Sequence, residues 1–266
     1  MTTIAVPPTR FVSPAKALRH GFSLAWRGLV KIRKNPEQLV DVTIQPIILL
    51  VVFVYLFGGA IAGGTGEYLQ TLTPGLLVQN TLMASLSAGV ALNTDVNKGV
   101  FDRFRAMPIA RSAPLVGAVL ADVVRYLVAI GVLLGMAMIM GFRVHTDPLS
   151  VLVAIATLVL AGLCFCWIAV FIGMLVPTPA AVQNIMMAIV FPLTFGSNVF
   201  VPSATMPSFL RAWSDISPVS RLADAMRGLL TGGPVAGPLL GGLAWLAAVV
   251  LVFFPLAMRA YRRRVS

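Results

Sequence analysis

The sequence contains few charged residues. Of its 266 residues only 11% are charged, whereas 58% are hydrophobic, and the mean hydropathy is +0.92. A soluble domain carries about 25% charged residues, so this chain has too few charges to cover a water-facing surface. The excess of apolar residues also excludes intrinsic disorder. The composition is therefore typical of a polytopic membrane protein.

Thiols and imidazoles are equally scarce, with two cysteines and two histidines in the chain. Cys164 and Cys166 lie one residue apart in an apolar stretch, far along the chain from His20 and His145. A zinc site or a disulfide framework needs more ligands at closer spacing. We therefore expect two small thiols in the core and no metal site.

Catalytic motifs are missing as well. No glycine is followed by lysine, which excludes the P-loop motif GxxxxGK[ST], and neither HExxH nor GxSxG occurs. Of the nine acidic residues, only Asp41 and Asp122 lie within apolar segments, whereas ion-driven carriers place several titratable groups near the bilayer midplane. We expect no catalytic residue and no cofactor in this chain, with a secondary drug/proton antiporter as the alternative to an ATP-driven pump.

Long apolar runs dominate what remains, and a helix needs about 20 residues to cross a bilayer. The uncharged stretch 148–210 is too long for one crossing, and Pro177 and Pro179 divide it because proline disrupts a helix. The sequence thus predicts an all-α fold of six spans within residues 39–258, between tails at 1–38 and 259–266. The predicted spans are 39–62, 73–94, 114–142, 149–176, 180–200 and 237–258.

Basic residues indicate the orientation. Fifteen of the 20 lysines and arginines lie in the two tails and in the loop after the second span, so the positive-inside rule places both termini in the cytoplasm. In the N-terminal tail, Leu18, Phe22 and Trp26 recur at helical spacing opposite a basic face. This pattern predicts an amphipathic helix in the headgroup layer.

Amides are the main polar groups within the predicted spans, and they can hydrogen-bond a neutral compound without requiring that it be charged. We expect them to line a substrate path. The candidates are Gln45, Asn80, Gln183, Asn184 and Asn198.

One charged pair lies within the third span. Asp122 and Arg125 are three residues apart and share a helix face. We expect a self-neutralised salt bridge with Arg125 reaching toward the headgroups; the alternative is a polar relay on the path. Two GxxxG motifs, at 59–63 and 131–135, are expected to pack within the subunit.

Three segments carry a family resemblance. RKNPE at 33–37 leads into Gln45-Pro46, DVNKGVFDRFRAMP occupies 95–108, and FPLTFGSNVFVP at 191–202 leads to Ser217-Pro218. With the six spans, these segments resemble the membrane subunit of ABC-2 type exporters, specifically the daunorubicin-resistance-like permeases. The resemblance covers residues 33–232. The family usually has asparagine where this chain has Ser217.

The resemblance implies a permease subunit in the bacterial cytoplasmic membrane that exports a hydrophobic or amphiphilic compound, such as a drug, lipid or metabolite. It implies a second permease copy, identical or similar, and two copies of a separate ATPase that holds the ATP and magnesium.

The resemblance also implies that the loop at 95–112 docks on the ATPase, with Phe101 and Phe104 as apolar anchors of the kind that dominate interface energetics. The expected interface consists of Lys98, Gly99, Phe101, Asp102, Arg103, Phe104, Arg105 and Pro108. Residues 201–236 are expected to form short, partly re-entrant helices at the outer face. There the i,i+3 spacings of Arg221, Asp224 and Arg227 predict ion pairs.

Overall fold

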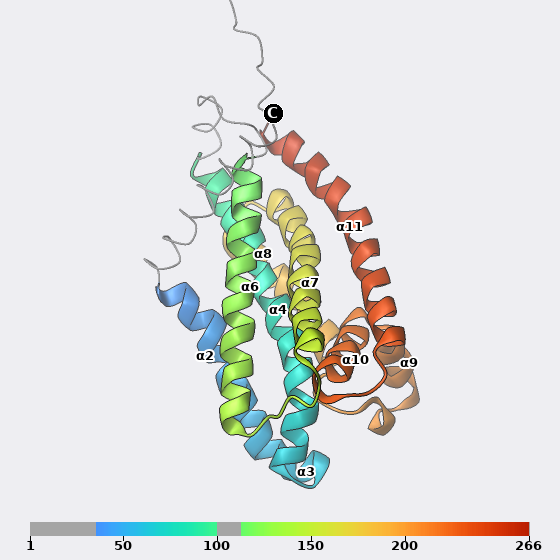
Figure 1. Cartoon of the computed structure of the whole chain (residues 1–266). Helices are drawn as coiled ribbons and strands as arrows, with labels where there is room; N and C mark the ends of the chain where they lie inside the picture. The colour runs from blue at the N-terminus through green and yellow to red at the C-terminus, as the bar shows by residue number, and fades with distance from the viewer. Residues whose placement is uncertain (1–35, 100–112, 266) are drawn as a thin grey trace, which may run out of the picture.

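The computed structural model describes residues 36–99 and 113–265, which form helices joined by short connections (Figure 1). Among these described residues, five helices are long and apolar enough to cross a membrane, and Pro179–Phe195 is a shorter apolar sixth. The prediction of an all-α polytopic membrane protein is confirmed. The elements are α2 (Pro36–Val52), η1 (Phe53–Phe57), α3 (Gly58–Ala62), α4 (Thr65–Asn97), α6 (Ala113–Met140), α7 (Pro148–Leu175), α8 (Pro179–Phe195), η2 (Ser203–Thr205), α9 (Ser208–Ile216), α10 (Pro218–Thr231) and α11 (Ala236–Val265).

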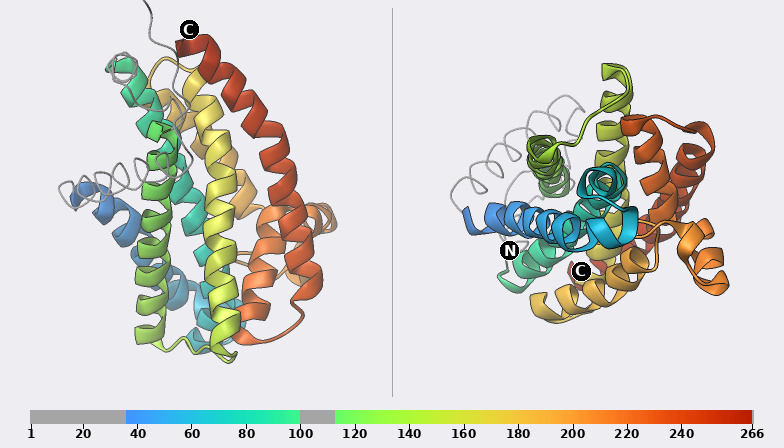
Figure 2. Two further views of the ribbon diagram at one scale, coloured as in Figure 1. Left: turned by 45° about the horizontal axis from the view of Figure 1, so that its top comes forward. Right: turned by 90° about the horizontal axis from the view of Figure 1, so that it is seen from below.

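Helix α4 is the centre of the bundle. It packs against α6, α7, α8 and α10, and the view from below in Figure 2 shows it among these helices. Because protein surrounds it, α4 carries polar residues that a lipid-facing helix would not tolerate. The hydroxyls of Thr81 and Ser85 are satisfied by the helix itself, through the carbonyls of Leu77 at 2.8 Å and Leu82 at 2.7 Å.

The helix ends differ from the predicted spans at several places, of which three are the largest. Helix α4 begins at Thr65, not at 73, because the left-handed Gly63 (φ 71°) turns the chain directly out of α3. Helix α8 ends at Phe195, not at 200. Helix α11 continues to Val265, so the residues predicted as a basic tail are helical and extend α11 past the candidate span, which ends at Tyr261.

The contact between α4 and α7 depends on glycine. A Cβ built on Gly89 would lie 2.2 Å from the carbonyl oxygen of Ala169, and one on Gly173 would lie 2.6 Å from the carbonyl oxygen of Gly89. The two backbones therefore touch, as small residues permit in membrane helices. Nearby on α7, Cys164 and Cys166 are buried free thiols, as predicted.

The two GxxxG motifs behave differently. A Cβ on Gly59, Gly63, Gly131 or Gly135 would meet nothing within 4 Å. The expectation that these motifs pack within the subunit is wrong. These glycines face away from the neighbouring helices. The GxxxG motif does not determine how its helix is rotated about its axis, and therefore does not determine which neighbour it faces.

The predicted outer segment forms η2, α9 and α10. Helix α10 is largely buried and packs against α4, α7 and α11. Ser217 lies between α9 and α10, and its backbone N–H bonds the carbonyl of Trp213 at 2.9 Å. The departure from the family's asparagine does not prevent this turn, although the Ser217 hydroxyl is buried without a partner.

Candidate functional site

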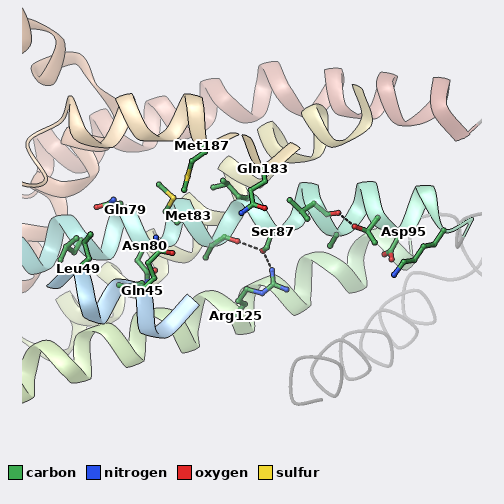
Figure 3. A pocket seen from close by; sticks show the side chains of 18 residues that line it. Gln45, Leu49, Gln79, Asn80, Met83, Ser87, Asp95, Arg125, Gln183 and Met187 are labelled. Atoms are coloured by element: carbon green, nitrogen blue, oxygen red, sulfur yellow. Dashed lines mark hydrogen bonds between the residues drawn. The ribbon is translucent and has the colours of Figure 1, made fainter. Parts of the chain in front are cut away.

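A cavity of about 720 Å³ opens along one side of α4, bounded by α2, α6 and α8. Figure 3 shows Gln45 and Asn80 on the side of α2, and Gln183 and Met187 on the side of α8. Its volume lies within the range of about 300–1,000 Å³ that is usual for small-molecule sites. The lining residues are Gln45, Pro46, Leu49, Leu76, Gln79, Asn80, Met83, Ala84, Leu86, Ser87, Val90, Ala91, Thr94, Asp95, Lys98, Arg125, Gln183 and Met187.

Three of the five amides predicted for a substrate path come together in this cavity. Gln45 from α2, Asn80 from α4 and Gln183 from α8 all line it. Asn184, one residue beyond Gln183, is exposed and does not line it. Asn198 lies past the end of α8, in a separate cluster.

The cavity wall along α4 extends beyond the five predicted amides. Met83, Ser87, Val90 and Thr94 continue one face of α4 from Asn80. Their spacing of three or four residues is the helical period. The helical spacing can be read from the sequence. It does not show, however, that Met83 and Val90 face a cavity, because core residues have the same spacing.

Arg125 is the arginine in the cavity wall. Its Nη1 lies 2.8 Å from Oδ1 of Asp122, and the same Nη1 donates to the hydroxyl of Ser87 on α4 (Figure 3). The self-paired salt bridge is as expected, but the side chain points to α4 and not toward the headgroups. The expectation that Arg125 reaches outward is therefore wrong, because Asp122 and Ser87 together satisfy the guanidinium inside the bundle.

The end of α4 begins the predicted ATPase-docking loop. Lys98 follows the last helical residue, and Gly99 has φ 63°, a left-handed conformation that favours glycine. Lys98 also lines the cavity. The remaining members of the predicted interface, at 100–112, lie outside the described residues, as does the predicted N-terminal amphipathic helix. Those residues are Phe101, Asp102, Arg103, Phe104, Arg105 and Pro108.

At the opposite end of α4, Arg227 of α10 joins three segments. It bonds Oδ1 of Asp224 at 2.8 Å, the carbonyl of Asn198 at 2.5 Å and the carbonyl of Thr71 at 3.2 Å. Asn198 also donates to Asp224 at 2.8 Å. Burial lowers the pKa of Arg227, an effect that the ion pair with Asp224 opposes. These contacts fasten α10 to α4 and to the end of α8.

The other predicted outer pair does not form. Among the described residues, the ion pairs include Asp224 with Arg227 but not with Arg221. The side chain of Arg221 lies instead against α11, where a Cβ on Gly241 would be 3.3 Å from its Cδ. The i,i+3 spacing allows Asp224 to pair with either arginine. Arg221 packs against α11 instead, and Asp224 pairs with Arg227.

Comparison with known proteins identifies relatives along nearly the whole chain. The family model described as ABC-2 type transporter matches residues 20–231. The chain is 39% identical over 259 residues to the Daunorubicin resistance ABC transporter permease protein DrrB1 of Streptomyces coeruleorubidus, covering 97% of this chain and 89% of that protein.

More distant relatives show the same pattern. The Probable doxorubicin resistance ABC transporter permease protein DrrC of Mycobacterium tuberculosis is 25% identical over 241 residues, covering 89% of this chain and 86% of that protein. The Putative transport permease ycf38 of Cyanophora paradoxa is 26% identical over 217 residues, covering 77% of this chain and 72% of that protein.

Proposed function

The chain belongs to the ABC-2 type transporter family, and we propose that it forms the membrane path of an exporter for hydrophobic or amphiphilic compounds driven by a separate ATPase subunit. It is a multi-pass bacterial membrane protein of the permease type. The cargo class and the partners are the proposed part.

The cavity beside α4 is the observation that supports this cargo class. Its wall combines amides from three helices with apolar residues such as Met83 and Met187. The charge of Arg125 is balanced by Asp122 at 2.8 Å. The middle of the wall therefore offers hydrogen bonds and apolar surface but no unpaired charge. These properties suit a neutral amphiphile. Several relatives are named for resistance to daunorubicin or doxorubicin, which also supports an amphiphilic cargo.

We assign ATP hydrolysis to two copies of a partner ATPase. We assign the transport path to a dimer of this chain with a second permease, identical or similar. The docking site on this chain would be the loop at 95–112. Lys98 and Gly99, at the end of α4, connect that loop directly to the cavity wall.

Transport in membrane vesicles that contain the permease and its candidate ATPase subunit tests the proposal. Uptake of a fluorescent amphiphile into inverted vesicles should require ATP, stop with vanadate and persist with a protonophore. The reverse pattern would establish the secondary antiporter instead. A P-loop lysine variant of the ATPase is the control for ATP dependence.

Truncation of the two loop phenylalanines tests the docking site. Because an aromatic anchor typically contributes about 2–4 kcal/mol to binding, Phe101→Ala/Phe104→Ala should abolish co-purification of the ATPase, whereas Lys98→Ala should weaken it mildly. The measurement is a pull-down at equal membrane expression. Unchanged ATPase binding by the double variant would show that the two phenylalanines do not anchor the ATPase.

A further inference from the structure

Side chains from two other helices converge on the C-terminal carbonyls of α7. Nη1 of Arg264, near the end of α11, lies 2.9 Å from the carbonyl oxygen of Gly173, 3.1 Å from that of Met174 and 2.8 Å from that of Val176. A helix leaves its last four carbonyls without intrahelical partners, and they carry partial negative charge. The guanidinium of Arg264 therefore bonds two carbonyls in the last turn of α7 and the carbonyl that directly follows the helix.

Helix α4 contributes the other side chains of this cluster. Nδ2 of Asn93 donates to the carbonyls of Gly173 and Val176, both at 2.8 Å. Nδ2 of Asn97 donates to the carbonyl of Pro177 at 2.8 Å and to Oδ1 of Asn93 at 3.0 Å. Asn93 is fully buried, so its hydrogen bonds cannot be exchanged for water without cost.

A direct bond links the two helices that flank α7. Nη2 of Arg264 donates to Oδ1 of Asn97 at 3.2 Å. Asn97 is the last residue of α4 and is followed directly by Lys98 and the loop that the proposed function assigns to the ATPase. In Figure 1 the ends of α4 and α11 lie at the same end of the bundle. A displacement of this end of α4 must move α7 and α11 with it or break these hydrogen bonds.

The far end of α11 lies beside the outer segment. Helix α11 packs along α7 and against α10, and α10 holds Arg227 and its contacts to Thr71 and Asn198. Two clusters thus lie at the two ends of the same set of packed helices. The Arg264 cluster consists of Asn93, Asn97, Arg264 and the carbonyls of residues 173, 174, 176 and 177. The Arg227 cluster consists of Asn198, Asp224, Arg227 and the carbonyl of Thr71.

We propose that Arg264 is a positioning residue for export: it transmits movement of the ATPase-facing end of α4 to α7 and α11. This inference rests on the proposed function, because it needs an ATPase that moves the loop after α4. A basic residue that served only to orient the chain in the membrane would not need this geometry. Arg259, on the same helix, is exposed and provides the comparison.

The test measures cargo transported per ATP hydrolysed by the full complex. Arg264→Gln should leave ATPase co-purification unchanged and lower the transport ratio by about fivefold or more, the smallest size typical of a coupling between sites. The transport ratio of Arg264→Lys should lie between those of the wild type and Arg264→Gln. Lysine keeps the positive charge, but its ammonium cannot reproduce the planar fork of the guanidinium. Arg259→Gln, which removes the same charge from the same helix, should keep the wild-type ratio.

Two measurements separate coupling from a structural role. The thermal melting and the yield of folded complex are recorded for each variant. If Arg264→Gln lowers only the amount of folded complex, or keeps the wild-type ratio of transport to hydrolysis, the proposal is overturned. A wild-type complex that shows no ATP-driven transport would instead refute the proposed function.

A double variant sharpens the assignment. If Arg264 acts through Asn97, Asn97→Ala combined with Arg264→Gln should lower the transport ratio no more than the more harmful single change does. Additive losses would show that the two residues act separately and would overturn the proposed route through the end of α4.

Discussion

The two sides of α4 are built in opposite ways. Toward α7, the backbones touch at Gly89 and Gly173, and no side chain separates them. Toward α2 and α8, the same helix faces a cavity of about 720 Å³. The comparison indicates a bundle with one fixed side, α4 with α7 and α10, and one open side whose walls can move.

The physical basis lies in the contact surfaces. Backbone contact gains dispersion energy over many atoms and leaves no room for rotation or sliding. The walls of the open side are different: Gln45 and Gln183 are exposed, and the first span contains the π-helical turn Phe53–Phe57, a distortion often found at functional sites. We expect the cavity to change shape by movement of α2 and α8 against a constant α4–α7 pair.

The largest expected effect comes from filling the contact on the fixed side. Gly89→Leu places a side chain where a Cβ alone would lie 2.2 Å from the Ala169 carbonyl oxygen, and a backbone atom cannot yield as a side chain can. Overpacking of a core costs about 1–3 kcal/mol and occasionally more, so we expect a strongly reduced yield of folded permease. The readout is the folded yield by size-exclusion chromatography in detergent.

Gly131→Leu is the matched control for that change. It adds the same side chain to a glycine with nothing within 4 Å of its Cβ position, so the yield should be that of the wild type. Equal yields for the Gly89 and Gly131 variants would show that α4 and α7 are not in backbone contact.

The second effect, about 2 kcal/mol, concerns the end of the fixed side at which α10 meets α4. Arg227→Met removes the bonds to Asp224, Asn198 and Thr71, of which Asn198 is buried, so the melting temperature should fall. Arg221→Met, on the same helix α10 but outside the ion pair, should change the melting temperature little. The measurement is thermal melting of both variants. Equal melting temperatures would show that the Arg227 contacts do not stabilise the packing of α10 on α4.

The third effect lies on the open side and should alter transport without altering stability. Gln183→Leu removes a lining amide, and loss of one hydrogen bond of about 1 kcal/mol lowers cargo affinity about fivefold. Asn184→Leu makes a comparable change one residue away, outside the cavity lining. Vesicle transport as a function of cargo concentration compares the two. A larger loss for the Asn184 variant would place the path elsewhere.

The smallest effect concerns the connection between α9 and α10. The Ser217 hydroxyl is buried without a partner, so Ser217→Ala should change stability by less than about 0.5 kcal/mol. Ser220 provides the contrast, because its hydroxyl accepts from the Asn198 N–H at 3.2 Å and lies 3.0 Å from the Ser214 hydroxyl. Ser220→Ala should cost about 1 kcal/mol. Chemical denaturation of the two variants decides whether this order holds.

Much of the site was predictable from local pattern. Asp122 and Arg125 are one helical turn apart, and they pair as the spacing predicts. Gln45, Asn80 and Gln183 were recognised as amides within apolar spans, and they meet in one cavity. Asn198 was recognised in the same way but lies with Arg227 and Asp224, because a residue's position along a span does not determine which neighbours its side chain meets.

The sequence by itself determined the class of protein, the approximate positions of the spans and the family. These follow from hydropathy, proline placement and the basic residues, all of which act locally along the chain. The tertiary structure decided which glycines touch a neighbouring backbone, where α11 ends and what Arg264 binds. Those features depend on the rotation and tilt of each helix, which are set by packing against its neighbours and not by its own residues alone.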